Sequence, residues 1–479
     1  MFQPCIVVGL LFVALLAARP ADAETIVEQQ AATEREYAAQ LKALARRCDE
    51  KKLPEQAAAT RKWIVPQAPL TLVVPLADER LPEAGDEASQ AVREWAERFR
   101  RLRQAQGKQW FELAQRAAKE RQFAMAFQRV HATLREDPDH QAARRLLGYK
   151  RQQGRWLSPY ESNKAQAHQV WHERFGWLPE KQVARYESGE RFFKGRWITA
   201  DEDERLHAEI GRGWDVVTEH YQVRTDHSLE EGVRLASRLE EFYGVWRQLF
   251  VRYVVPDEQL ARLFREGAPA NRVHRRHQVT YFRNREEYMR ALGKEHPAIG
   301  ITTGYYAGPQ RTAYFFVGDE EDDSTVYHEA THQLFSELKQ VSQVGRDANF
   351  WVVEGIACFM ESYKPGNRLV TLGGADALRL DNARTWLLEK GQYLPLAELC
   401  ALGMDDLQGH AEIKMIYSEA SGMTYYLLFA GEGRYRQSLV DYLSAVYANR
   451  DRPQTLAELT GTSFSKHDEQ YHQFLKHLP

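Results

Sequence analysis

Two histidines and a glutamate occur at the spacing of a metal-dependent hydrolase. The segment HEATH at 328–332 has the pattern His-Glu-x-x-His. On a helix, His328 and His332 lie one turn apart and point the same way, so their ring nitrogens reach one metal ion and Glu329 lies beside it. The metal lowers the pKa of a bound water to about 7, and the carboxylate accepts the proton as the water attacks a carbonyl.

The pattern alone is moderately specific. With 16 histidines in 479 residues, a chance match is expected at a probability on the order of 0.05. The alternative is that both histidines are polar residues with hydrogen-bond partners on a half-buried helix. The residues further along the chain therefore decide between a metal site and this alternative.

A catalytic zinc ion needs a third protein ligand and an open position for water. A third histidine in a glycine-containing extension is excluded, because Phe335 and Leu338 occupy the positions where Gly and His would fall. The segment WVVEGIACFMES at 351–362 offers Glu354 instead, on what we expect to be the next helix. Gly355 beside it would let two helices approach closely, which a ligand shared between helices requires.

Two further side chains on this segment have open roles. Glu361 lies on the same face as Glu354, where it would orient a ligating histidine by a hydrogen bond or act as a salt-bridge partner. Cys358 lies one turn from Glu354, and we interpret it as a core residue rather than a ligand. Glu354 itself has the alternative of a helix-surface carboxylate.

The surrounding residues indicate the elements that hold the site. Asp323 or Ser324 suits a helix N-cap, and the acidic run 319–323 suits the positive end of that helix. Upstream, strands are predicted at 216–223 and 279–282, with a hairpin at 302–317 and a long amphipathic helix at 229–249. After the hairpin the pattern is almost wholly helical. Strands followed by helices give an α+β order.

Together, HEATH and WVVEGIACFMES resemble the gluzincin metallopeptidases, and most of all the peptidase-MA-like domains of uncharacterised exported bacterial proteins. The resemblance covers about 214–443. It implies one zinc per chain, with His328, His332 and Glu354 as ligands and Glu329 as the base. The segment that binds a substrate amino terminus in aminopeptidases is replaced by GYYAG at 304–308. The resemblance therefore favours an endopeptidase over an aminopeptidase.

The resemblance also implies a tyrosine that donates to the oxyanion from a helix beyond the third ligand. Tyr417, in IYSEASG at 416–422, is the best match. Tyr425 and Tyr426 are rivals, but they stand deeper in an apolar run and are expected in the core. The edge strand at 304–307 would hold an extended peptide by strand addition.

The first residues are predicted to be a signal peptide, 1–23. An apolar run at 6–18 precedes a small-residue cleavage signal that ends at Ala23, and it is too short to span a bilayer. The alternative is an uncleaved membrane anchor. No later stretch approaches 18 apolar residues, so we expect an exported chain, periplasmic or secreted, with no membrane span after cleavage. Cleavage would leave Cys48, Cys358 and Cys400, which allow at most one disulfide.

Three segments are predicted in the mature chain. The first, 24–150, is helical, and its helix pair at 108–120 and 123–135 resembles one tetratricopeptide-type repeat, with a plain helical hairpin as the alternative. A proline-rich linker within it carries one short strand at 70–74. The second, 151–213, is a connector in which GRWLSP and GRWITA repeat a turn, a buried tryptophan and a helix cap. The third, 214–479, is the zincin-like domain, with a small mixed or antiparallel sheet, active-site helices and an all-helical end.

The composition limits the possible partners. Lys and Arg total 64 against 67 for Asp and Glu, so no basic excess points to nucleic acid. The sequence favours zinc-dependent hydrolysis of a peptide or protein substrate, with a possible protein partner bound by the helical region. The main alternative is a non-catalytic binding scaffold with a zinc-stabilised, peptidase-like domain. A zinc hydrolase that acts on a non-peptide bond is a third hypothesis.

Overall fold

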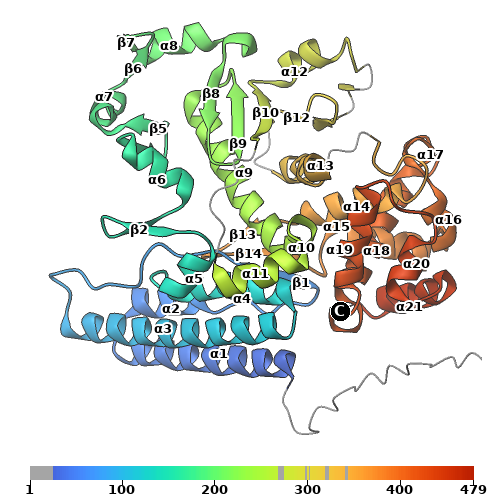
Figure 1. The fold of residues 1–479 in the computed structure, drawn as a ribbon, viewed down its shortest axis with the longest axis horizontal. Helices are drawn as coiled ribbons and strands as arrows, with labels where there is room; N and C mark the ends of the chain where they lie inside the picture. Colours follow the sequence, from blue (N-terminus) through green and yellow to red (C-terminus); the bar gives the residue numbers. More distant parts are fainter. Residues whose placement is uncertain are drawn as a thin grey trace, which may run out of the picture.

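The computed structural model describes residues 25–267, 275–296, 299–300, 302–318, 323–339 and 343–478. Over these ranges the chain has the predicted α+β order, with helices at the N-terminal end, small sheets and a helical C-terminal part (Figure 1). The predicted signal peptide lies outside the described residues. No described helix combines the length and the apolar character needed to cross a membrane.

The N-terminal end consists of helices that lie side by side (Figure 1). The predicted helix pair is present, although its first helix begins much earlier than expected. Ala114, Ala117 and Ala126 are fully buried where the two helices meet, so their backbones approach closely. The likeness to a tetratricopeptide repeat stays a prediction. The helices are α1 (Ile26–Glu50), α2 (Pro54–Trp63), α3 (Gln90–Lys119), α4 (Phe123–Glu136) and α5 (Gln141–Leu146).

The connector forms an arm of three hairpin-and-helix units along one side of the molecule (Figure 1). Ser158 and Thr199 cap the helices of the first and third units, as predicted. The tryptophans of the two GRW segments are half-buried rather than buried, because each stands in an isolated two-stranded hairpin with little core around it. The units are β2 (Lys150–Gln152), β3 (Arg155–Leu157) and α6 (Pro159–Gln166); β4 (Gln169–His172), β5 (Gly176–Pro179), η1 (Glu180–Gln182) and α7 (Val183–Glu187); and β6 (Glu190–Phe193), β7 (Arg196–Thr199), α8 (Ala200–His207) and η2 (Ile210–Arg212).

The middle unit was not predicted. Its hairpin carries Gly176-Trp177-Leu178, which lacks the arginine of the other two copies. A proline, Pro179, stands where they have the Ser or Thr cap. The shared feature is only a glycine and a tryptophan before an apolar residue, and that pattern is too short to identify from the sequence.

A mixed five-stranded sheet follows the arm, in the order β11-β12-β10-β9-β8. Its three central strands run parallel, and each edge strand is antiparallel to its neighbour. The prediction of one strand at 216–223 is wrong, because Thr218 bonds back to Tyr221 and turns the chain into a hairpin. The strands are β8 (Trp214–Val217), β9 (Tyr221–Thr225), β10 (His277–Phe282), β11 (Gly304–Ala307) and β12 (Thr312–Phe316). The helices among them are α9 (Leu229–Leu249), α10 (Val251–Val254), α11 (Asp257–Glu266) and α12 (Arg285–Leu292).

The C-terminal part is helical, and its first helix lies between the sheet and the remaining helices (Figure 1). Gly355 permits a close contact between α14 and α18, since a Cβ there would lie 2.5 Å from the Ala420 carbonyl oxygen and the Thr424 hydroxyl. The elements are α13 (Ser324–Lys339), α14 (Phe350–Met360), α15 (Leu378–Arg384), a π-helical turn (Thr385–Glu389), α16 (Leu396–Ala401), α17 (Met404–Gln408), α18 (Ile413–Gly433), α19 (Arg436–Val446), α20 (Thr455–Thr460) and α21 (Phe464–Lys476).

A second sheet joins the two ends of the chain. The predicted short strand is β1 (Thr71–Pro75), and it pairs antiparallel with β14 (Leu369–Gly373), which also pairs with β13 (Lys364–Pro365). Beside this sheet, buried Arg135 donates hydrogen bonds to the backbone oxygens of Trp63 and Arg368. The segment 24–150 therefore shares a sheet and a buried polar network with the segment 214–479.

Candidate metal centre

The helix that carries His-Glu-x-x-His is held on two sides. Asp323, directly before the first residue of α13, forms an ion pair with Arg238 on α9. Tyr327, Ala330 and Leu334 bury the opposite face against the core, whereas Leu338 is exposed at the end of the helix. The other face of α13 is therefore free to present its histidines toward α14.

The structure brings the two predicted histidines and Glu354 together. The Nε2 atoms of His328 and His332 are 3.1 Å apart, and Glu354 Oε2 lies 3.5 Å from the first and 3.7 Å from the second. All three side chains are mostly buried, with exposed fractions of 14%, 15% and 7%. Three potential ligand atoms thus converge on one point between α13 and α14.

These separations suit a small cation. Ligands at about 2.0–2.1 Å from a tetrahedral zinc ion are about 3.3 Å from one another, close to the three distances in the structure. The donor set of two imidazoles and one carboxylate also occurs at catalytic zinc sites that keep a position for water. The residues present therefore fit a zinc ion.

The charges at this point lead to the same conclusion. Burial disfavours the ionised form of Glu354, but the imidazoles of His332 and His328 outweigh it and hold the pKa of the carboxyl well below its usual range. Burial likewise disfavours the imidazolium of His328, but hydrogen bonds with Cys358, Glu354 and Glu361 hold its pKa well above the ordinary value. The carboxylates thus favour positive charge here, as a proton or as a metal ion.

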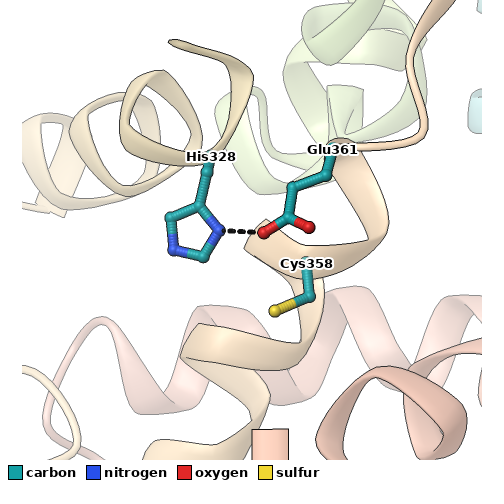
Figure 2. Close-up of side chains that lie close together, drawn as sticks. All are labelled: His328, Cys358 and Glu361. Carbon is teal, nitrogen blue, oxygen red and sulfur yellow. Dashed lines mark hydrogen bonds and ion pairs between the residues drawn. The ribbon is translucent and has the colours of Figure 1, made fainter. Parts of the chain in front are cut away.

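Glu361 fixes the orientation of His328. The Nδ1–H of His328 donates to Glu361 Oε1 at 2.8 Å (Figure 2). With the proton on Nδ1, the lone pair of Nε2 is directed at the centre. Arg379 on α15 donates two hydrogen bonds to the same carboxylate, at 2.7 and 2.8 Å. Two alternative roles were predicted for Glu361, and its contacts fit both: it orients His328 by a hydrogen bond and forms a salt bridge with Arg379.

Cys358 lies next to this pair. Figure 2 shows its thiol on the same side of α14 as Glu361, and a ligand atom from each of His328, Cys358 and Glu361 lies within 4.8 Å of the others. Burial raises the pKa of the thiol. The three cysteines expected in the mature chain, Cys48, Cys358 and Cys400, are buried and free.

Glu329 lies between the centre and the edge strand of the five-stranded sheet. Its Oε2 accepts a hydrogen bond from the Tyr306 backbone N–H on β11, at 2.8 Å. Gly304 makes this contact possible, because a Cβ there would lie 2.7 Å from a Thr325 methyl and 3.2 Å from Glu329 Cγ. The predicted base therefore lies beside both the candidate metal ligands and a strand edge.

Of the three candidate tyrosines, Tyr417 is the one that faces the centre. Burial, and after it the charge of the nearby Glu354 carboxylate, raises the pKa of its phenol well above the usual range. Tyr425 packs against Phe359 in the core. The Tyr426 hydroxyl donates to Gln470 on α21.

Sequence reasoning missed two functional groups of this site. Arg379 belongs to no motif, and the chain brings it to Glu361 only through the fold. The Tyr306 amide is a backbone group, and its place beside Glu329 depends on how β11 meets α13. The glycine at 304 was the available signal, because a strand residue without a side chain indicates a close approach.

Comparison with known proteins adds a family of undefined role. Residues 322–451 match the family described as "Protein of unknown function (DUF1570)". The matched segment contains both histidines, Glu329, Glu354, Glu361, Arg379 and Tyr417. None of the curated proteins compared with the chain matches it.

Proposed function

We propose that the protein is an exported zinc-dependent peptidase of the gluzincin type, and most simply an endopeptidase. The observation that carries the proposal is the convergence of His328 Nε2, His332 Nε2 and Glu354 Oε2 at the separations of zinc ligands, with Glu329 adjacent. A zinc ion held there would polarise a water molecule and the scissile carbonyl.

Glu329 has the position of a general base. Its carboxylate would accept a proton from the attacking water and later donate it to the nitrogen of the leaving amine. The hydrogen bond from the Tyr306 N–H holds one oxygen of the carboxylate, so the group is oriented before substrate binds. Such a base typically contributes about 10²–10⁴ in rate.

The edge strand β11 has the geometry of a peptide-binding edge. Among the described strands, β11 pairs only with β12. Because Tyr306 donates its N–H to Glu329, this residue directs its backbone polar groups away from β12, and Gly304 does the same by the alternation of an antiparallel pair. An extended substrate added to this edge would place its backbone next to Glu329.

Tyr417 would stabilise the negative charge that develops on the carbonyl oxygen. Its phenol stays protonated, because burial and the charge of Glu354 both disfavour the phenolate. A protonated phenol beside the metal ligands is a donor for an oxyanion, and the loss of one such donor costs about 10²–10³ in kcat.

The test combines a digest of a fluorogenic peptide library with metal analysis. The wild-type protein should contain one zinc per chain and cleave peptides. Glu329→Gln should keep its zinc and lose cleavage, and Tyr417→Phe should keep its zinc and its melting temperature but lose most of kcat. Tyr425→Phe is the matched control, because this tyrosine lies in the core, away from the centre. A wild-type protein that binds zinc but cleaves nothing would favour the scaffold hypothesis.

A further inference from the structure

A hollow lies directly beside the candidate metal centre. It has a volume of about 500 Å³ and is formed by α15, the π-helical turn and the first turns of α18. Arg379 and Tyr417 are part of its wall. Since Arg379 holds Glu361 and Tyr417 lies near enough to Glu354 to feel its charge, the hollow and the candidate metal centre share a wall.

The side chains around this hollow are basic. Arg379, Lys390 and Lys414 line it, and no aspartate or glutamate does. Glu361 neutralises Arg379 through Nε and Nη2, which leaves the Nη1 amino group of that arginine unused. Within the part of the chain that the structure describes, neither lysine forms an ion pair with a carboxylate. The hollow therefore carries a net positive charge that the protein itself does not neutralise.

The backbone at this place is unusual. Thr385–Glu389 is a π-helical turn, and its residues Thr385 and Trp386 line the hollow. π-Helical turns are rare and occur frequently at functional sites. The Nζ atom of Lys390 lies 3.5 Å from the centre of the Trp386 ring, so a cation–π contact holds this lysine at the wall.

We propose that this basic hollow binds a carboxylate of the substrate and makes the enzyme selective for anionic peptides. The proposal rests on the peptidase function proposed above. The carboxylate belongs either to an acidic side chain close to the scissile bond or to the C-terminus of the peptide. The volume of the hollow is that of a site for one or two amino-acid residues, and the lysines supply the charge that selects them.

The experiment measures the cleavage of four closely related peptides by the zinc-loaded full-length protein. They carry Glu or Gln at one position beside the scissile bond, and either a free or an amidated C-terminus. Peptides with the recognised carboxylate should be cleaved with about tenfold higher kcat/KM than their neutral partners, the gain typical of a hydrogen bond to a charged group. The Glu and Gln pair and the acid and amide pair separate the two sources of the carboxylate.

Variants of the lysines test the site itself. Lys390→Gln combined with Lys414→Gln should abolish the preference, so that the carboxylate and neutral peptides are cleaved with equal kcat/KM. Lys414→Glu should reverse it in favour of a lysine-containing peptide. Lys42→Gln, an exposed lysine on α1, is the matched control and should change neither value. Equal cleavage of all four peptides by the wild-type protein, or an unchanged preference in the double variant, would overturn the proposal.

Binding separates this proposal from the peptidase function. The dissociation constants of the four peptides are measured by calorimetry on Glu329→Gln protein, with and without the two lysine substitutions. If the carboxylate peptides bind in a lysine-dependent way but the wild type cleaves none of them, the peptidase function is ruled out and the anion site is supported. Cleavage without carboxylate preference would remove the anion site alone. If the protein neither cleaves nor binds the peptides, both the peptidase function and the anion site are ruled out.

Discussion

Glu354 is the single charged side chain on α14, whose residues are all buried. A buried carboxylate is costly unless it is paired, and its partners here are two imidazoles and the cation that they would share. The apolar helix around it therefore both desolvates this carboxylate and excludes competing polar contacts.

The first prediction at this scale concerns metal content. Glu354→Gln removes an anionic ligand, and zinc occupancy should fall well below one per chain. Glu361→Gln keeps all three ligands but loosens His328, so its zinc affinity should fall only by about 10–100-fold. Elemental analysis and a chelator competition measure both. Glu398→Gln on α16 is the control, and full zinc in Glu354→Gln would place the third ligand elsewhere.

A second carboxyl gives a pH dependence that is separate from the metal. Glu419 on α18 is buried, and burial raises its pKa to about 8. Its Oε2 accepts the Leu394 N–H, but Oε1 has no hydrogen-bond partner. In the unfolded chain the same carboxyl ionises at about 4.3. The unfolded state therefore loses its proton first as the pH rises.

From this follows a prediction for stability. Between about pH 4.5 and pH 8 the folded state binds more protons than the unfolded one, so the contribution of Glu419 to the free energy of unfolding should fall by up to about 1.4 kcal/mol per pH unit. Glu419→Gln should remove this slope and raise the melting temperature at pH 8 relative to the wild type. Thermal unfolding from pH 5 to pH 8 measures it, and parallel curves for the two proteins would contradict it.

At the scale of elements, the contact of α14 with α18 brings Glu354 and Tyr417 to one site. Gly355 permits this contact because no side chain separates the two helices. The same glycine was predicted to allow a close helix approach, and the partner helix proves to be the one that carries the candidate oxyanion donor. One backbone position thus sets the distance between Glu354, the candidate third ligand, and Tyr417, the candidate oxyanion donor.

A glycine pair tests this contact. In Gly355→Ala the added methyl would meet the Ala420 carbonyl oxygen and the Thr424 hydroxyl at 2.5 Å, and the overpacking should cost about 1–3 kcal/mol of unfolding free energy. Gly244→Ala on α9 meets nothing within 4 Å and should stabilise by up to about 1 kcal/mol. Denaturant unfolding of both variants measures the difference. Equal stability of the two would mean that α14 and α18 separate without cost.

The predictable part of the site is the local part. The spacing of His328 and His332 is a property of any helix, and the Glu-Gly pair marks the next helix from its own residues. The Glu361–Arg379 pair and the Glu329–Tyr306 contact depend on how separate elements pack, and no periodicity in the sequence reports that. The same distinction between local and long-range features holds for the fold. The bounds of α9 were predicted to the residue, whereas the pairing of β1 with β14 was not predicted at all.

At the scale of the whole molecule, one arginine joins the N-terminal helices to the region of the metal centre. The side chain of Arg135 is 3% exposed, and its bonds reach Glu136 on its own helix and the backbone oxygens of Trp63, at the end of α2, and Arg368, directly before β14. Because Arg368 directly precedes β14, the network connects α4 with the central strand of the second sheet.

Arg135→Ala should therefore weaken the whole fold. It removes the bonds to Trp63 and Arg368 and takes one of two arginines from the buried Glu136 carboxylate, so the loss should be about 3 kcal/mol of unfolding free energy. Arg145→Ala, on the exposed part of α5, is the control and should change the stability by about 0.5 kcal/mol or less. Unfolding in urea, followed by circular dichroism, measures both. A separate early transition, with the rest of the molecule unchanged, would show that the two ends unfold independently.

The strand pair β1–β14 also determines what a break in the chain would do. The arm of hairpins runs between the two partners of this pair, and its turn at Gly189 is exposed. A protease that cut there would produce two polypeptides, yet β1 would remain hydrogen-bonded to β14 and Arg135 would remain buried against it. The nicked protein would stay one particle in solution and separate only in denaturant. The covalent connection through the arm is then not needed to hold β1 on β14, and circular permutation within the arm would leave this strand pair intact.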